Sequence, residues 1–274
     1  MHENLLILLT LLSYSCLANL MLIPTTVSSG LLPTVSDSPA NRFLLTETPP
    51  KPKQITLKNF KKQTKNLTIR QMIKKYSVLI CIAISAILIV TATLLYPGGS
   101  LFDKNSTGFD WTKNFISNLF AEKAINGSEN PSRIWALTGV VFHSVGFGLF
   151  FMNMSKKMPS RHASNVLKYV GIFIILFNFL ITTPLHDPMI TISSTLSLLG
   201  LFYVTVFILK TRLHLFKFFC IICLLIFYYT LFLYGSGNWV LLAIMQKVSF
   251  ISLMLLILGL EYFTKLEDFN HISS

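Results

Sequence analysis

The side chains of this chain that could do chemistry interrupt long apolar runs, and most of them lie in or beside predicted membrane helices. Those inside a helix or at its mouth are His143, Asn178, His186, Asp187, Gln246 and Lys247. Three others lie in a polar stretch between two apolar runs: Asn114, Ser117 and Asn118. Ionisable groups are costly inside a bilayer, so they are candidates for function by default.

Two kinds of chemistry fit these side chains. Together they can form a polar pocket that binds a small ligand or a lipid headgroup. Alternatively, the chain is an intramembrane lipid or ester hydrolase in which His143, Asp187 and Ser117 form a general-base set, or His143, His186 and Asp187 hold a metal. The sequence contains no HExxH or GxSxG motif. It therefore favours a non-enzymatic binding protein, with no metal and no cofactor.

A third interpretation makes the same residues purely structural. Lys247 would pair with Asp187, and His143 would bond to a serine. Such polar contacts between membrane helices fix their register. The sequence leaves this alternative open.

Composition assigns the class of protein. The chain has 274 residues, of which 53% are hydrophobic and only 12% charged, whereas a soluble domain carries roughly 25% charged residues. The net charge of +12 comes from short basic runs between apolar segments, as topology signals do, so we predict no binding of nucleic acid. The four cysteines lie in apolar runs and indicate no disulfide framework. We expect an all-α, multi-pass transmembrane bundle whose partners are membrane lipids.

Six apolar segments are long enough to cross a hydrocarbon core of about 30 Å. They make a membrane domain over residues 77–262, with an outer loop at 97–133 and a cytoplasmic tail at 263–274. The predicted spans are residues 77–96, 134–154, 165–183, 188–209, 216–234 and 239–262.

Residues 1–76 precede these spans and divide into three parts. An apolar run at 5–23 is either a signal peptide or an additional helix. Residues 24–50 are rich in Ser, Thr and Pro and predict a disordered linker. Residues 51–75 carry nine bases and no acid, which is typical of a cytoplasmic anchor, an anionic-lipid patch or an organellar presequence that follows a signal. A true start near Met72 is a further alternative.

The charges of the connecting loops predict the orientation. Bases gather in the loops at 155–164 and 210–217, while the other loops are neutral or acidic. The positive-inside rule therefore places these two loops and the C-terminus in the cytoplasm. The 97–133 loop then lies outside, above the half of the bundle that holds the polar residues of the spans, among them His143 and Lys247.

Within the outer loop, residues 110–120 predict a short helix with Asp110 as its N-cap. Trp111, Phe115 and Leu119 would share one face, and Asn114, Ser117 and Asn118 another. The polar face would then form either a lid over an outward-open polar chamber or a cap that bonds helix ends.

Short motifs at the ends of these spans resemble a known family. The chain reads YPGG at 96–99 and Asn-x-Ile-Ser-Asn-Leu at 114–119, and Asp187-Pro188 and Gln246-Lys247 follow at later spans. These motifs resemble those of an uncharacterised six-span membrane family, domain of unknown function 998, over residues 77–262. A looser similarity exists to six-span proteins of the autophagy-modulator and GPI-lipid-remodelling type. The first resemblance implies the six-span fold and no particular activity.

The chain departs from that family at three places. Asn118 stands where the family has Asp, and Phe120 where it has Gly. The His that the family places at the start of the fourth span is replaced by the stretch 192–194. If those positions carry a catalytic acid or a metal ligand in the family, this chain lacks it.

Overall fold

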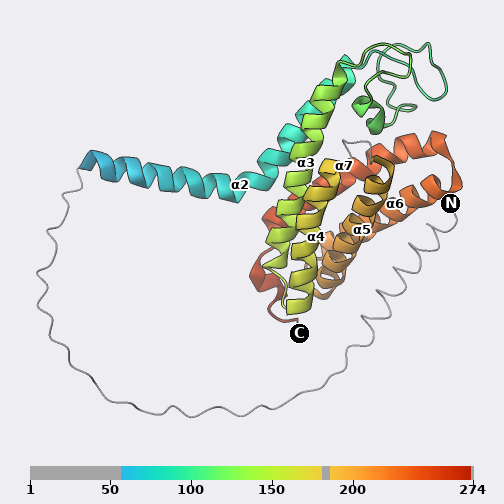
Figure 1. Ribbon diagram of the computed structural model, residues 1–274. Coiled ribbons are helices and arrows are strands. Elements are labelled where there is room, and N and C mark those ends of the chain that lie inside the picture. The colour runs from blue at the N-terminus through green and yellow to red at the C-terminus, as the bar shows by residue number, and fades with distance from the viewer. Residues whose placement is uncertain (1–56, 181–185, 273–274) are drawn as a thin grey trace, which may run out of the picture. The chain divides into compact units, whose positions relative to one another are not determined.

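The computed structural model describes the backbone of residues 57–180 and 186–272 (Figure 1). Side chains are described from Gln71 onward, except at 186, 187 and 190. The predictions for residues 5–23 and 24–50 lie outside this part of the chain. The chain divides into two units, one comprising residues 10–73 and the other including residues 74–274.

The described residues form helices joined by loops, and the all-α prediction is confirmed. Six of these helices are long and apolar enough to cross a membrane, so the predicted six-span bundle is confirmed as well. The helices are α2 (Leu57–Leu95), η1 (Ile116–Phe120), α3 (Ser132–Ser155), α4 (Arg161–Leu180), α5 (His186–Lys210), α6 (His214–Ser236), α7 (Trp239–Phe263) and η2 (Leu266–Phe269).

Helix α2 begins well before the predicted start of the first span. The helix runs from Leu57, and its apolar, membrane-length part is Gln71–Leu95. Most of the basic segment is therefore helical. Residues 57–73 belong to the first unit, and the bundle described below comprises residues 74–272.

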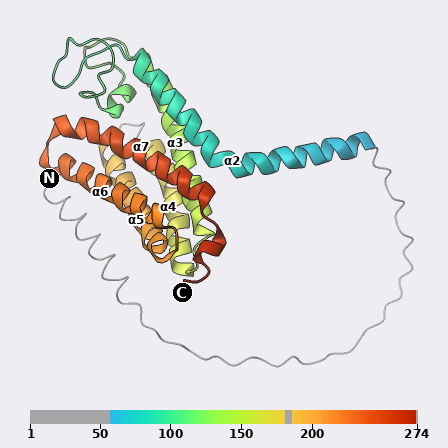
Figure 2. The same cartoon turned by 180° about the vertical axis from the view of Figure 1, so that it is seen from behind.

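The spans from α3 to α7 close into a ring. Each packs against the next in the chain, and α7 returns to contact α3. Figure 1 shows α3 beside α4, and Figure 2 shows α6 beside α7 from the other side. The α2 part of the bundle packs against α3, where Ile82 and Ile89 meet the glycines of that helix.

Glycines set the closest approaches between spans. A Cβ added at Gly148 of α3 would lie 2.6 Å from the carbonyl oxygen of Gly171 in α4, and the reverse distance is also 2.6 Å. On α5, a Cβ at Gly200 would lie 2.5 Å from the ring of Phe151. Helices in lipid gain little from the hydrophobic effect, so they associate through such close backbone packing.

Local sequence explains several helix ends. Pro131 precedes the first residue of α3, a place where the missing proline N–H costs nothing. Gly237 ends α6 in the left-handed conformation, with φ 72°, which glycine adopts without a steric penalty. Asn238 then caps α7 by accepting a hydrogen bond from the backbone N–H of Leu241.

The C-terminal segment folds back onto the bundle. Phe269 in η2 is fully buried and Ile272 nearly so. His271 bonds to the carbonyl oxygen of Lys210, at 3.1 Å between its Nε2 and that oxygen. The predicted tail is therefore held to the bundle at Thr264, Phe269 and Ile272, which are buried.

We expect Gly148→Ala to destabilise the bundle by about 1–3 kcal/mol, because the new methyl group would overlap backbone that cannot move aside. Thermal unfolding of the purified protein in detergent measures this effect. Gly139→Ala is the matched control, since its methyl group would meet the flexible side chain of Ile89 at 3.1 Å. Equal losses from the two variants would contradict the proposed backbone contact.

Candidate functional site

The loop between α2 and α3 is a folded element, and the end of the bundle where it lies is called the loop end below (Figure 1). Two glycines at its start require positive φ angles, 141° at Gly98 and 82° at Gly99. A Cβ at either glycine would lie within 2.3 Å of backbone atoms across the loop. The YPGG motif therefore lets the strand-like segments of the loop cross closely.

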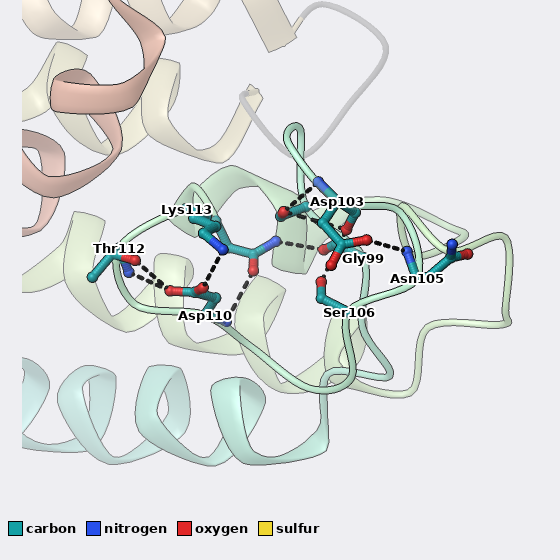
Figure 3. A network of polar contacts seen from close by, with 9 residues as sticks. Gly99, Asp103, Asn105, Ser106, Asp110, Thr112 and Lys113 are labelled. Atoms are coloured by element: carbon teal, nitrogen blue, oxygen red, sulfur yellow. Dashed lines mark hydrogen bonds and ion pairs between the residues drawn. The ribbon is translucent and has the colours of Figure 1, made fainter.

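Hydrogen bonds between side chains and backbone stabilise the fold of this loop, and Figure 3 shows part of the network. The Asp103 carboxylate accepts from the N–H of Asn105 at 2.9 Å. The Asp110 carboxylate accepts from the hydroxyl of Thr112 at 2.6 Å and from its N–H at 2.8 Å. These two bonds lower the pKa of Asp110 below its usual range.

The predicted continuous helix over 110–120 is wrong. Residues 111–113 form a turn, and only Ile116–Phe120 are helical, as a short 3-10 segment. The two predicted faces do not form either, because Trp111 is 48% exposed whereas Leu119 is fully buried. Asp110 bonds its carboxylate to the next turn instead of capping a helix.

Asn114 and Asn118 serve the fold of the loop. The buried amide of Asn114 donates to the carbonyl of Gly99 at 2.7 Å and accepts from the N–H of Asp110 at 2.9 Å. Asn118 accepts from the N–H of Phe115 at 2.7 Å. The structure thus gives both asparagines intraloop partners.

Two neighbouring residues of α7 fasten the loop to the bundle. The Gln246 side chain accepts from the N–H of Ile116 at 2.9 Å. The Lys247 ammonium, only 6% exposed, donates to the carbonyl of Asn114 at 2.6 Å and to that of Ala243 at 2.5 Å. It also lies over the ring of Phe109. The side chain of Lys247 therefore points toward the loop.

Beneath the loop lies a cavity of about 670 Å³, within the range of sites for drug-sized ligands. Its wall comes from all six spanning helices and from Phe115, Ile116, Ser117 and Phe120 of the loop. Hydroxyl groups are frequent on the wall, and the residues that carry them are Ser85, Ser117, Thr191, Ser193, Ser194, Thr195, Ser197, Thr230, Tyr234 and Ser249.

Two polar atoms on this wall have no hydrogen-bond partner within the described part of the chain. One is Nδ1 of His143, and the other is the hydroxyl of the fully buried Ser85. The imidazole of His143 stacks on the ring of Phe250 at a centroid distance of 4.6 Å and lies against the tilted ring of Phe147 at 4.1 Å. These two contacts restrict the orientation of the imidazole.

The structure brings some of the predicted site residues together and separates others. Four line the cavity: Ser117, His143, Asn178 and Gln246. Of these, Asn178 also accepts a hydrogen bond from Ser193. Asn114, Asn118 and Lys247 lie outside the lining, and the side chains of His186 and Asp187 lie outside the described residues.

Sequence reasoning missed several polar residues of the bundle. Ser85 is a single hydroxyl in an apolar run, a signal that composition does not reveal. At the opposite end, Glu261 accepts from the amide of Asn153 at 2.8 Å, and Lys157 donates to the backbone carbonyl of Glu261 at 3.0 Å. Polar contacts therefore also occur at the end of the bundle opposite the loop.

The described residues contain no group of three or more His, Cys, Asp or Glu side chains placed to hold a metal ion. Comparison with models of protein families, with curated proteins and with solved structures finds no match to this chain. The resemblance drawn from the YPGG and Asn-x-Ile-Ser-Asn-Leu motifs stays a prediction.

We expect Lys247→Met to release the loop from the bundle, because the carbonyl of Asn114 would lose its buried charged donor. A lost bond of this kind costs about 1–3 kcal/mol. Hydrogen exchange of the backbone amides in 110–118 should therefore become about tenfold faster, as measured by mass spectrometry.

Lys113→Met makes the same chemical change on the loop surface and is the control. Its ammonium lies 3.6 Å from the Asp110 carboxylate in an exposed pair, which is worth about 0–1 kcal/mol. Unchanged exchange in Lys247→Met, or equal exchange in the two variants, would refute the anchoring role.

Proposed function

We propose that this six-span protein binds a small ligand or a lipid headgroup in the cavity beneath the loop. The observation that carries the proposal is the wall itself, where two buried polar atoms, on His143 and Ser85, lack a partner among the described residues. Most buried polar groups in native proteins are hydrogen-bonded. A bound molecule would supply the missing hydrogen-bond partners.

The loop residues support this division of roles. Asn114, Asn118 and Lys247 use their side chains in contacts that hold the loop. A purely structural network accounts for them. A purely structural network does not account for the polar atoms of His143 and Ser85, because these atoms make no hydrogen bond within the described residues.

A hydrolase is the second candidate, because Ser117 and His143 line the same cavity. A serine nucleophile and a histidine base would have to come within hydrogen-bonding reach during the reaction. Turnover of a fluorogenic acyl ester that is abolished by Ser117→Ala would favour the hydrolase over simple binding.

We propose further that the cavity faces the outer side of the membrane. The loops at 155–164 and 210–217, at the opposite end of the bundle, carry bases without acids, whereas the 97–133 loop balances its bases with acids. Positively charged loops are retained in the cytoplasm. A ligand would then enter from outside or from the outer leaflet.

Cysteine labelling tests this orientation. We expect Asn105→Cys to react with a membrane-impermeant maleimide in intact cells, and Lys156→Cys to react only after permeabilisation. Both parent residues are exposed, and the native Cys220 and Cys223 are buried and should react slowly. The reverse pattern would overturn the proposed orientation.

Filling the cavity should abolish binding. Ser249→Trp places an indole in the cavity lining, so we expect loss of any molecule that co-purifies with the protein, as detected by native mass spectrometry. Val248→Trp is the control on the same helix, since Val248 is 40% exposed and is not part of the lining. Retention of the bound molecule in a folded Ser249→Trp protein would contradict binding at this site.

A further inference from the structure

We infer that the ligand is an uncharged amphiphile with a hydroxyl-bearing head and hydrocarbon chains, of the diacylglycerol class. This inference rests on the proposed binding function and specifies the ligand for the same cavity. It follows from the charge of the lining, from its partnerless polar atoms and from its apolar surface.

The described lining contains no Asp, Glu, Lys or Arg. A charged headgroup taken out of water must recover its lost hydration from an opposite charge and from hydrogen bonds. Lys247 is the cation adjacent to Gln246 in the sequence, but its ammonium already donates to the carbonyls of Asn114 and Ala243. The described wall therefore offers a phosphate no counter-charge.

A hydroxyl group suits the polar part of the wall. It donates one hydrogen bond and accepts others, so it can pair with Nδ1 of His143 in either neutral tautomer. It can also pair with the hydroxyl of Ser85, the second partnerless group of the lining. A neutral head of this kind therefore adds no charge to a wall whose described lining has none.

The remaining wall suits hydrocarbon. Phe147 and Phe250 flank the imidazole of His143. Further apolar side chains of the lining are Ile89, Phe227, Leu231 and Leu253. Burial of acyl chains against such surface supplies roughly 25 cal/mol per Å². Polar and apolar parts of the wall thus match the two parts of an amphiphile.

The test compares two lipids that share their acyl chains. The purified full-length protein in nanodiscs is offered labelled 1,2-dioleoylglycerol or dioleoylphosphatidate, which differ by the phosphate group. We expect the diacylglycerol to bind at least about tenfold more tightly. Equal or tighter binding of the phosphatidate would overturn the inference.

Matched variants locate the binding. We expect His143→Phe, which keeps a stacked ring and removes the ring nitrogens, and Ser85→Ala each to weaken diacylglycerol binding by about tenfold. Ser144→Ala is the control, because its buried hydroxyl bonds to the carbonyl of Val140 in the same helix. Diacylglycerol binding that neither cavity variant weakens would also overturn the inference.

The two proposals fail in different ways. If neither lipid binds but another molecule co-purifies and is lost in Ser249→Trp, the diacylglycerol class is wrong and the binding function stands. If no molecule binds to the folded protein in any of these experiments, both proposals are wrong.

Discussion

The contact between the Lys247 ammonium and the carbonyl of Asn114 is the interaction on which the loop end depends. An ammonium in the apolar part of a bundle must find acceptors within the protein, since lipid offers none. Asn114 supplies its backbone oxygen at 2.6 Å, while its side chain ties Gly99 to Asp110. One residue therefore joins the start of the loop, its middle and helix α7.

This arrangement leaves the cavity below without charge among its described lining. The ammonium of Lys247, the next residue after the lining residue Gln246, bonds to the loop. The loop contributes Phe115, Ile116, Ser117 and Phe120 to the wall of the cavity. Two sets of polar groups result. The upper set is satisfied and makes structure, and the lower set includes partnerless atoms on His143 and Ser85. The proposed ligand would meet the lower set, because the upper set already has its hydrogen-bond partners.

The spans were predictable because bilayer thickness sets a minimum length that apolar runs reveal directly. The fold of the loop was not predictable, because it depends on contacts between residues that are distant in the sequence. The spacing of Asn114, Ser117 and Asn118 predicts one helical face, but positive φ angles at Gly98 and Gly99 and the Asp110 turn give another path. The sequence also indicates how deep in the membrane a residue lies, but not the direction in which its side chain points. Lys247 and His143 were expected to face one chamber, yet the structure turns Lys247 toward the loop and leaves His143 on the cavity wall.

The closest backbone contact between α3 and α4 and the cavities occupy different parts of the bundle. The backbones of α3 and α4 meet at Gly148 and Gly171, about one turn farther from the loop end than His143. Toward the loop end from that crossing, a second cavity of about 200 Å³ lies between the same helices, lined in part by Val141 and Ile175. The larger cavity lies at this same end of the bundle, where residues of the loop form part of its wall. Gln246 and Lys247 of α7 hold that loop in place, so the wall of the cavity depends on their contacts with the backbone of Ile116 and Asn114.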